Sequence, residues 1–195
     1  MKRLFDIVIS LIIVVLFLPF GVIIAILIML GSRGGVFYIQ QRIGKEGVPF
    51  GLIKFRTMNK DADKAGKLTV GMRDPRITRV GLFLRKYKLD EFPQFLNVIK
   101  GEMSIVGPRP EVEEYVNLYT EDQKQVLKIK PGITDYASLE YFEENELLGK
   151  SEAPRKTYVE EVMPAKIRLN QEYIENSGLG QDLKIIWKTF LRILS

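Results

Sequence analysis

An uninterrupted apolar segment near the N-terminus limits what this chain can fold into more than any other feature. Residues 7–30 contain no charged side chain and a single hydroxyl group, that of Ser10. A helix of this segment would be roughly 36 Å long at about 1.5 Å per residue, which is enough to cross a bilayer core of about 30 Å. The segment is too long for a cleavable signal peptide, and no small-x-small cleavage site follows it. The sequence therefore predicts a helix held in a membrane.

Two features indicate that this helix enters and leaves the membrane on the same side. Pro19 lies in the middle of the segment, where it removes a backbone hydrogen bond and kinks the helix. Both flanks are basic, with Lys2 and Arg3 before the segment and Arg33 after it. Because basic flanks are retained in the cytoplasm, a re-entrant helix is favoured, and a spanning helix is the alternative. Asp6, in the first turns, is expected to anchor the end of the helix.

The composition limits the chemistry that a site in this chain could use. The 195 residues suffice for one domain with an attachment, which we divide into a re-entrant helix over residues 1–32 and a domain over residues 33–195. The chain has no cysteine and no histidine, which excludes disulfides, thiolate chemistry and the commonest zinc ligand. Carboxylate, lysine, arginine, tyrosine, serine and threonine side chains remain, together with a hard cation such as Mg²⁺ bound through oxygen. The net charge of +5 fits nucleic acid, a phosphorylated substrate or an anionic lipid.

The segment 85–111 brings together the residue types that phosphate chemistry requires. Its basic start is followed by the carboxylates of Asp90 and Glu91 and then by Pro93, which is tolerated in the first turn of a helix. Asp90 is therefore expected near a helix start, where backbone N–H groups keep a carboxylate ionised. Arg109 lies between two prolines in a stiff turn, and its planar guanidinium can bind two phosphate oxygens at once. Separately, these residues could be an N-cap and a solvated turn, but their order favours a site for a phosphate and a metal ion.

Three stretches of this segment form a long signature. They are LDEFPQ at residues 89–94, NVIKGEMS at residues 97–104 and VGPRP at residues 106–110, with shorter matches at residues 41–44, 54–58 and 131–134. The signature resembles that of the bacterial sugar transferases, specifically the small monotopic polyprenyl-phosphate phosphoglycosyl transferases. Two positions depart from the family pattern. Leu18 precedes Pro19 where the family often has serine, and Asp135 follows Thr134 where the family often has glycine.

The resemblance implies an enzyme, a phosphoglycosyl transferase, that uses a UDP-sugar and a polyprenyl (undecaprenyl) phosphate. Asp90 would attack the sugar-bearing phosphate, expel UMP and carry the phosphosugar until the polyprenyl phosphate accepts it. Glu91 would remove a proton from the acceptor or orient it, and Mg²⁺ would bind the diphosphate and Asp90. The product, polyprenyl-diphosphate-sugar, would begin a polysaccharide or glycoconjugate such as lipopolysaccharide or capsule.

The resemblance also implies supporting residues and a location. Substrate phosphate would be bound by Arg109, Lys54, Arg85 and Arg56, and the nucleotide by Pro131, Gly132 and Thr134. The protein would lie in the bacterial inner (cytoplasmic) membrane, with its catalytic domain, residues 33–195, on the cytoplasmic face of the lipid bilayer. No nucleic acid is expected as a partner, because no recognised binding motif is present. The sugar, the prenyl length and the oligomeric state, a homodimer included, stay open.

Periodicity and turn residues predict an α+β fold that is mostly helical. A β-hairpin is expected from residues 36–42 and 50–57. Helices are expected over residues 79–88, from 92 to Gly101, over 123–128 after a Thr120–Gln123 capping box, and over 140–148, 164–175 and 182–194. The second of these should bury Phe92, Phe95, Leu96 and Ile99. The basic amphipathic helices 79–88 and 182–194 could lie at the membrane interface or pack inward, and Trp187 favours the interface for the last.

Two other functions compete with this one. Asp61-Ala62-Asp63 echoes the metal-binding motif of metal-dependent glycosyltransferases, which would release UDP rather than UMP. Those enzymes place the motif at a strand end, whereas here it lies in a polar, lysine-rich stretch, so a solvated helix or loop is favoured. A non-catalytic membrane scaffold is the other alternative, and it would leave the dense carboxylate and arginine motifs unexplained.

Overall fold

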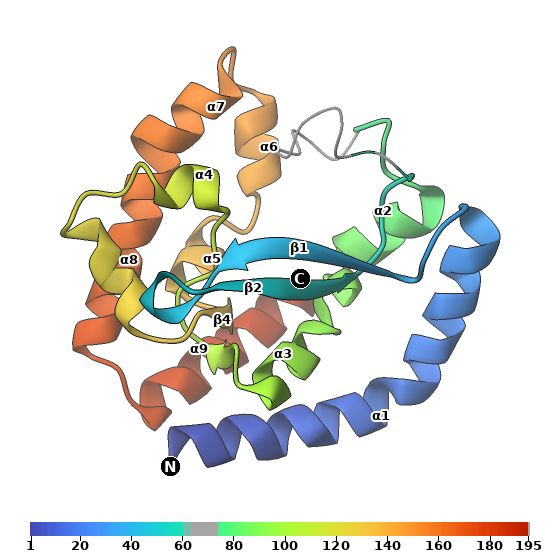
Figure 1. Ribbon diagram of the computed structural model, residues 1–195, viewed down its shortest axis with the longest axis horizontal. Coiled ribbons are helices and arrows are strands. Elements are labelled where there is room, and N and C mark those ends of the chain that lie inside the picture. The colour runs from blue at the N-terminus through green and yellow to red at the C-terminus, as the bar shows by residue number, and fades with distance from the viewer. Residues whose placement is uncertain (61, 63–73, 195) are drawn as a thin grey trace.

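The fold is α+β and mostly helical, as predicted, with its strands in short pairs (Figure 1). The computed structural model describes residues 1–60, 62 and 74–194. Its helices are α1 (Lys2–Gly31), α2 (Arg79–Lys86), α3 (Gln94–Lys100), α4 (Glu113–Val116), α5 (Tyr136–Glu140), α6 (Glu144–Gly149), α7 (Pro154–Thr157), α8 (Met163–Glu175) and α9 (Leu179–Leu194). The strands are β1 (Phe37–Ile43), β2 (Pro49–Phe55), β3 (Ser104–Val106) and β4 (Gly132–Thr134). Short 3₁₀ segments η1 (Lys45–Gly47), η3 (Leu89–Glu91) and η4 (Gln123–Lys128) and a π segment η5 (Tyr158–Val162) complete the described chain.

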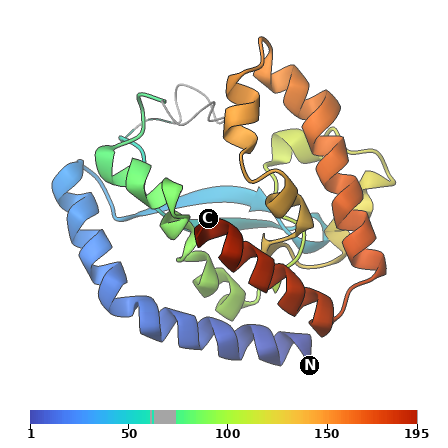
Figure 2. The ribbon, with the colours of Figure 1, turned by 180° about the vertical axis from the view of Figure 1, so that it is seen from behind.

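Helix α1 carries the apolar segment and is long and apolar enough to cross a membrane, judged by length and composition alone. Only 11% of its most apolar window is buried inside the protein. The helix contains Pro19, and Figures 1 and 2 show it running along one edge of the molecule and then bending. The bend agrees with the predicted kink, and the helix continues through it without interruption. Re-entrant insertion into a membrane stays a prediction.

Both ends of α1 are tied to the same domain. Near its start, the Arg3 guanidinium donates hydrogen bonds to the carbonyl oxygens of Val98 (2.6 Å) and Ile99 (3.0 Å) in the last turn of α3. Just after its end, the carbonyl and hydroxyl oxygens of Ser32 each accept a 3.0 Å bond from Arg56. A helix whose two ends return to one domain has the geometry that a re-entrant segment requires.

The first turns of α1 also carry charges that the domain binds. Asp6 is 3% exposed, and its carboxylate accepts hydrogen bonds from Ser104 Oγ (2.8 Å) and from the Ile105 amide (3.3 Å) of β3. Lys2 forms an ion pair with the buried carboxylate of Asp182 at the start of α9. Asp6 therefore anchors the helix end, as predicted. The basic residues interpreted as a membrane flank are bound to the domain as well.

The predicted β-hairpin is present and lies against α3. Strands β1 and β2 pair antiparallel, with Phe37 opposite Phe55. The Asn97 amide group on α3 is fully buried, donates to the Gly51 carbonyl oxygen (2.8 Å) and accepts from the Ile53 amide (3.0 Å). These two bonds fix α3 to β2 and so set the position of the segment that precedes α3.

The prediction of which face of α3 is buried is confirmed only in part. The prediction concerns Phe92, Phe95, Leu96 and Ile99. The buried side chains are instead those of Gln94, Asn97 and Val98. Because Asn97 turns inward to bond to β2, the apolar stripe is rotated toward α1, where Phe92 stacks on Phe17 with ring centroids 3.9 Å apart. The stripe is therefore only partly buried, and Leu96 is 36% exposed.

A short parallel strand pair, which the sequence analysis does not predict, connects the centre of the fold to the proposed site. Strands β3 and β4 pair with Ser104 beside Gly132 and Val106 beside Thr134. Strands of three residues are too short to give a readable alternation. At the end of the pair the two backbone segments are in close contact. A Cβ atom added to Gly132 would lie 2.2 Å from the Gly107 nitrogen, so only glycine fits there.

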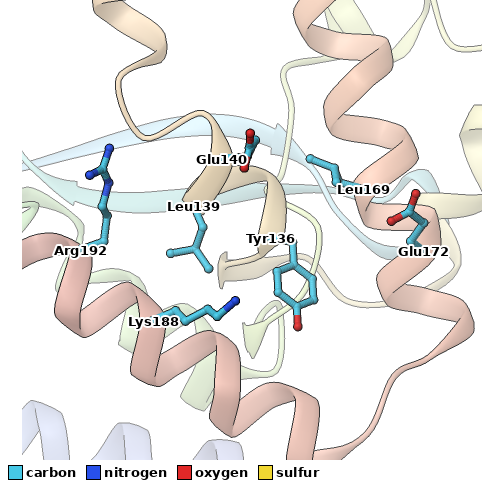
Figure 3. Close-up of a pocket in the computed structure, with 7 residues that line it drawn as sticks. All are labelled: Tyr136, Leu139, Glu140, Leu169, Glu172, Lys188 and Arg192. Atoms are coloured by element: carbon cyan, nitrogen blue, oxygen red, sulfur yellow. The ribbon is translucent and has the colours of Figure 1, made fainter.

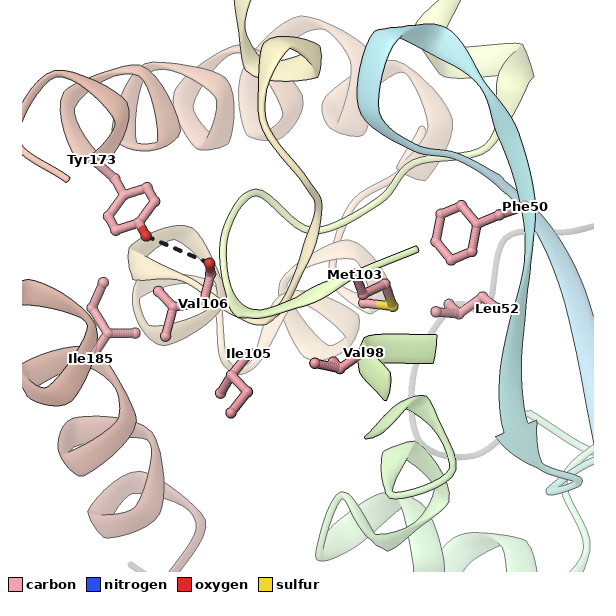
Figure 4. Packing of buried hydrophobic residues seen from close by; sticks show 8 residues of the cluster. All are labelled: Phe50, Leu52, Val98, Met103, Ile105, Val106, Tyr173 and Ile185. Carbon is pink, nitrogen blue, oxygen red and sulfur yellow. Dashed lines mark hydrogen bonds between the residues drawn. The ribbon is translucent and has the colours of Figure 1, made fainter. Parts of the chain in front are cut away.

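The core around this strand pair joins the hairpin, α3, α8 and α9. Its buried members are Phe50, Leu52, Val98, Met103, Ile105, Val106, Tyr173 and Ile185 (Figure 4). The Tyr173 hydroxyl lies 3.5 Å from the Val106 carbonyl oxygen and donates a 2.6 Å hydrogen bond to Asp182. This packing fixes α8 and α9 relative to β3, so the C-terminal helix is part of the domain and not an appendage.

Helix α9 presents its apolar stripe outward. Ile185 is fully buried against the core, whereas Leu183 and Phe190 are exposed and Trp187 is 62% exposed. Core packing, one of the two predicted possibilities for this helix, is achieved by a different face from the one carrying the tryptophan. The exposed stripe is consistent with the interface prediction.

Helix α2 divides its apolar side chains between the interior and the surface. Leu84 is fully buried against Phe55, Ile24 and Ile28, while Phe83 and Tyr87 are exposed. One face of this helix therefore packs inward, as one prediction has it. The exposed aromatic residues leave the other prediction, a place at a membrane interface, open for the opposite face.

Other local predictions hold in part. Thr120 and Gln123 exchange the capping-box bonds at 3.0 and 3.2 Å, but the segment they open, η4, is a 3₁₀ helix. The helix predicted over 164–175 matches α8, whereas the one predicted over 140–148 is divided between α5 and α6. Asp61 and Asp63 lie outside the described residues.

Gly132→Ala should destabilise the fold severely. Its Cβ atom would meet the Gly107 backbone at 2.2–2.4 Å, so β3 and β4 would have to separate, at a cost of about 3 kcal/mol or more. Gly180→Ala is the matched control, because nothing lies within 4 Å of its added methyl group and alanine favours helix α9. Thermal unfolding should show a large loss for the first variant and a small gain for the second. Equal stabilities would contradict the close contact.

Candidate active site

Asp90 is presented by a sharp junction between α2 and α3. Lys88, two residues after the end of α2, has a left-handed backbone (φ +54°), which is uncommon for a residue other than glycine. The 3₁₀ turn η3 follows at once and carries Asp90 and Glu91, and α3 begins three residues after Glu91. Asp90 is 7% exposed. The predicted location near a helix start is confirmed, but the expectation that backbone N–H groups keep the carboxylate ionised is wrong, because no N–H group of the described residues donates to it and burial raises its pKa.

Glu91 is held rigidly by two cations. One Arg109 nitrogen, Nη1, donates to Glu91 Oε2 at 3.0 Å, and the other, Nη2, pairs with Oε1. The Lys54 ammonium lies 3.4 Å from the same Oε1. Burial alone would raise the pKa of Glu91, but the charges of Arg109 and Lys54 outweigh it and hold that pKa well below its usual value. A carboxylate in this state is a poor proton acceptor, so of its two predicted roles the geometry favours orientation.

Asp90 differs from its neighbour in its surroundings. Burial, together with the adjacent negative charge of Glu91, raises the pKa of Asp90, although Lys54, Arg85 and Lys88 act in the opposite direction. No described residue donates a hydrogen bond to its carboxylate. The site therefore contains one carboxylate whose oxygens are fixed by partners and one whose oxygens are available for chemistry.

Arg109 is fixed at its backbone as well as at its side chain. Its amide donates to Asp135 Oδ2 at 3.0 Å, and the other Asp135 oxygen accepts from the Ser138 amide at 2.5 Å as the N-cap of α5. The negative charge of Glu91 raises the pKa of Arg109, so this group stays charged. Asp135 is a residue whose role the sequence analysis missed. The signal was the Asp-x-x-Ser spacing of an N-cap, at the position where the chain departs from the family pattern.

The other predicted cations are only partly brought together. Lys54 lies in the site, and burial lowers its pKa although Glu91 opposes the shift. Arg85 lies close enough for Asp90 to act on its charge, and its Nε donates to Thr57 Oγ1 at 2.9 Å. Arg56 does not join them. It follows the last residue of β2, where the chain leaves the strand, and its guanidinium binds Ser32 beyond α1.

The predicted nucleotide residues are used within the fold. Pro131 accepts a backbone hydrogen bond from Ser104, and Gly132 has no room for a side chain. Thr134 accepts from the Gly107 amide through its carbonyl oxygen, and its hydroxyl bonds to that of Thr189 at 2.7 Å. All three are buried in or beside β4. In this structure they align Arg109 and Asp135, and direct contact with a nucleotide stays a prediction.

The residues present fit a magnesium ion in a limited way. Among the described residues, no group of three or more histidine, cysteine, aspartate or glutamate side chains could hold a metal ion. Magnesium is commonly bound by one or two carboxylates, with waters and substrate phosphates as its other ligands. The Asp90 oxygens could serve in such a set, whereas those of Glu91 are engaged by Arg109. A magnesium ion here would therefore depend on the substrate for much of its coordination.

The comparison with known protein families gives the class and the family of this chain. The family described as bacterial sugar transferase matches residues 1–195. The chain therefore belongs to the bacterial sugar transferase family.

Individual relatives agree with this assignment. The exopolysaccharide production protein ExoY of Rhizobium meliloti is 35% identical over 96% of this chain and 83% of its own length. The UDP-glucose:undecaprenyl-phosphate glucose-1-phosphate transferase of Escherichia coli is 35% identical over 98% of this chain but only 40% of its own length. The UDP-N-acetylgalactosamine-undecaprenyl-phosphate N-acetylgalactosaminephosphotransferase of Aeromonas hydrophila is 33% identical over the whole chain and 44% of its own length. The chain thus spans less than half of the last two relatives.

Asp90→Asn should stabilise the protein at neutral pH. Because the native pKa of Asp90 is raised, folding opposes its ionisation, and a neutral amide avoids that cost. The native state retains the extra proton between the pKa of an unfolded aspartate, about 3.9, and the higher native value. The advantage of the variant should therefore be complete above the native pKa and shrink as pH falls through it. Urea unfolding of both proteins across this range measures the difference, and a variant less stable at neutral pH would contradict the raised pKa.

Glu91→Gln should have the opposite effect. The native pKa of Glu91 is lowered, so its charge stabilises the fold, and removing it should cost about 2 kcal/mol at neutral pH. That contribution is complete above the pKa of an unfolded glutamate, about 4.3, and is lost only as pH falls through the lower native value. The cost should thus stay constant from neutral pH down to about pH 5. A difference that already fades near neutral pH would mean that the ion pairs with Arg109 and Lys54 do not hold.

Proposed function

We propose that this protein transfers a phosphosugar from a UDP-sugar to a polyprenyl phosphate, through a covalent intermediate on Asp90. The observation that carries the proposal is the contrast between two adjacent buried carboxylates. Glu91 is locked by Arg109 and Lys54, while the oxygens of Asp90 accept no hydrogen bond from the described residues. The names of the relatives, which specify undecaprenyl phosphate and UDP-sugars, support the same reaction.

In the first step a carboxylate oxygen of Asp90 attacks the phosphorus that carries the sugar. The bond from that phosphorus to the bridging oxygen breaks, and UMP leaves with the electron pair. The product on the enzyme is a mixed anhydride of Asp90 and the sugar phosphate, a kind of intermediate that carboxylates form in other phosphoryl transfers. The raised pKa of Asp90 suits this role, because a more basic carboxylate is a better nucleophile.

In the second step a phosphate oxygen of the polyprenyl phosphate attacks the same phosphorus. The bond to Asp90 breaks, the carboxylate is restored, and polyprenyl-diphosphate-sugar is released. The acceptor phosphate is largely ionised near neutral pH, with a second pKa of about 6, so little proton removal is needed. We therefore give Glu91 the orienting role, in which it holds Arg109 and Lys54 beside the reacting phosphate.

Charge neutralisation is the main physical problem, because an anion must attack an anion. Lys54, Arg85 and Lys88 each act electrostatically on Asp90, and Arg109 is fixed beside Glu91. These cations offset part of the negative charge that the two phosphates bring. A bound magnesium ion would supply further charge stabilisation at the diphosphate, with Asp90 as its protein ligand.

The apolar surfaces support a location of this chemistry at a lipid boundary. Helix α1 exposes most of its apolar side chains, and exposed aromatic residues also lie in or beside α2 and α9, namely Phe83, Tyr87, Trp187 and Phe190. Aromatic residues with basic neighbours are typical of membrane interfaces. We propose a location in the bacterial inner membrane with the domain of residues 33–195 on the cytoplasmic face, where a water-borne donor and a lipid-borne acceptor can meet.

The sugar is not selected by these observations. The relatives named above use glucose in one case and N-acetylgalactosamine in another. The rival glycosyltransferase reading depends on Asp61 and Asp63, which lie outside the described residues, and no observation in the described part of the chain favours it. A scaffold without catalysis would give no reason for a buried aspartate with a raised pKa.

The full chain in membranes or detergent should release UMP, not UDP, from a UDP-sugar when Mg²⁺ and polyprenyl phosphate are present. When no acceptor is present, a UDP-sugar with a radioactive β-phosphate should label the protein. Mass spectrometry should locate the label on Asp90. Asp90→Asn should abolish both turnover and labelling, because an amide oxygen is a poor nucleophile toward phosphorus. Glu91→Gln, the neighbouring control, should slow turnover but still permit labelling. Release of UDP, or a label on another residue, would refute the proposal.

A further inference from the structure

A cavity that the proposed reaction does not yet use lies between α5, α8 and α9 (Figure 3). Its volume is about 450 Å³, within the range of small-molecule sites. Tyr136 and Leu139 of α5 and Leu169 of α8 provide apolar walls. Figure 3 shows the Tyr136 ring projecting from α5 into the space between α8 and α9. The cavity therefore offers an aromatic surface that one flat molecule could cover.

Four charged side chains complete the lining, with the positive ones on α9 and the negative ones on α5 and α8. Lys188 and Arg192, one turn apart on α9, are the cations, and Glu140 of α5 and Glu172 of α8 are the carboxylates. The Lys188 ammonium lies 5.9 Å from the centre of the Tyr136 ring. A ligand that matches this lining would combine an aromatic ring, hydroxyl groups for the carboxylates and a phosphate for the cations.

The Phe142 ring links the cavity to the segment that carries Asp90. Two cations lie near this ring, with Lys88 Nζ 5.0 Å and the Arg192 guanidinium carbon 5.2 Å from its centre. These two charges can therefore be no more than roughly 10 Å apart. Lys88 in turn acts on Asp90. The end of the cavity that carries Arg192 is thus linked, through Phe142, to a cation that acts on Asp90.

The cavity is also built onto the same backbone that positions Arg109. Tyr136 directly follows Asp135, which binds the Arg109 amide at 3.0 Å. Strand β4, whose residues resemble the family motif for the nucleotide, ends one residue earlier at Thr134. The residues of that motif are buried, so a ligand held near them would meet the side chains that follow, beginning with Tyr136.

From these observations we infer that this cavity binds the nucleoside part of the UDP-sugar donor. The uracil ring covers Tyr136, the ribose hydroxyls donate to Glu140 or Glu172, and the diphosphate passes Lys188 and Arg192 toward Asp90. The inference rests on the proposed function, because it takes the donor to be a nucleotide. It assigns the nucleotide to residues of α5, α8 and α9 instead of Pro131, Gly132 and Thr134.

A lipid headgroup is the competing occupant, and the geometry of α9 argues against it. Successive residues of a helix are about 100° apart, so Lys188 is turned by about 100° and Arg192 by about 140° from Trp187. The exposed stripe of Trp187, Leu183 and Phe190 is the part of α9 suited to lipid. The cavity thus opens on a different side of the helix from the stripe, which suits a water-borne ligand.

Binding of UMP to the full chain, measured by calorimetry without acceptor, tests the inference. Tyr136→Leu removes the stacking surface and Lys188→Gln removes a phosphate-binding charge. Each should weaken UMP binding about tenfold, as expected for the loss of one base stack or one charged hydrogen bond. Tyr136→Phe keeps the ring and should bind UMP like the original chain. Lys184→Gln, one turn earlier on α9 and outside the cavity lining, is the matched control and should also leave the affinity unchanged. Thermal unfolding verifies that each variant folds.

Turnover separates this inference from the proposed function. If both hold, the two cavity variants raise KM for the UDP-sugar about tenfold, leave kcat within about threefold and leave KM for the polyprenyl phosphate unchanged. Binding of UMP that the variants weaken, in a protein without transferase activity, would support the cavity and refute the proposed function. Unchanged UMP affinity in Tyr136→Leu and Lys188→Gln, absence of UMP binding, or an effect only on KM for the polyprenyl phosphate would overturn the cavity assignment.

Discussion

The paired hydrogen bonds between Arg109 and Glu91 are the interaction on which the rest of the site depends. They join the turn after β3 to the segment before α3, and they take the carboxylate of Glu91 out of acid–base chemistry. A buried pair of this kind stabilises little relative to an apolar pair, but breaking one side leaves a costly charge behind. Its value here lies in geometry, because it leaves Asp90 as the carboxylate with unengaged oxygens in a setting already rich in positive charge.

The surrounding fold can be understood as a frame for that pair. Asn97 fixes α3 to β2, which places Lys54 and Glu91 together, and Asp135 fixes the backbone of Arg109. The closely packed glycines between β3 and β4 bring these two halves into contact. Elements that contribute side chains to the site are thus positioned by short-range polar bonds, while the large apolar surfaces of α1, α2 and α9 remain exposed.

The sequence was informative where chemistry or periodicity leaves a local mark. The apolar segment, the hairpin, the helix start at Asp90, the capping box of Thr120 and the anchoring by Asp6 could all be predicted. The parallel pair of β3 and β4 could not, because strands of three residues show no alternation. The partners of Arg56 and Arg109 could not be predicted either, since each cation binds a residue distant in sequence. Likewise, the burial of Asn97 in place of Leu96 could not be predicted, because the polar partners of Asn97 lie on β2, far away in the sequence.

The contacts of the first turns of α1 bear on how such an enzyme could be made water-soluble. Truncating the whole of α1 would also remove Arg3 from the carbonyl groups of Val98 and Ile99 and Asp6 from Ser104. Several polar groups of the domain would then lack partners, each at a cost of about 1–3 kcal/mol where the group is buried. A water-soluble variant would therefore have to keep residues 1–6 and change only the exposed apolar side chains of α1. The same helix carries these side chains and the polar contacts that stabilise the domain.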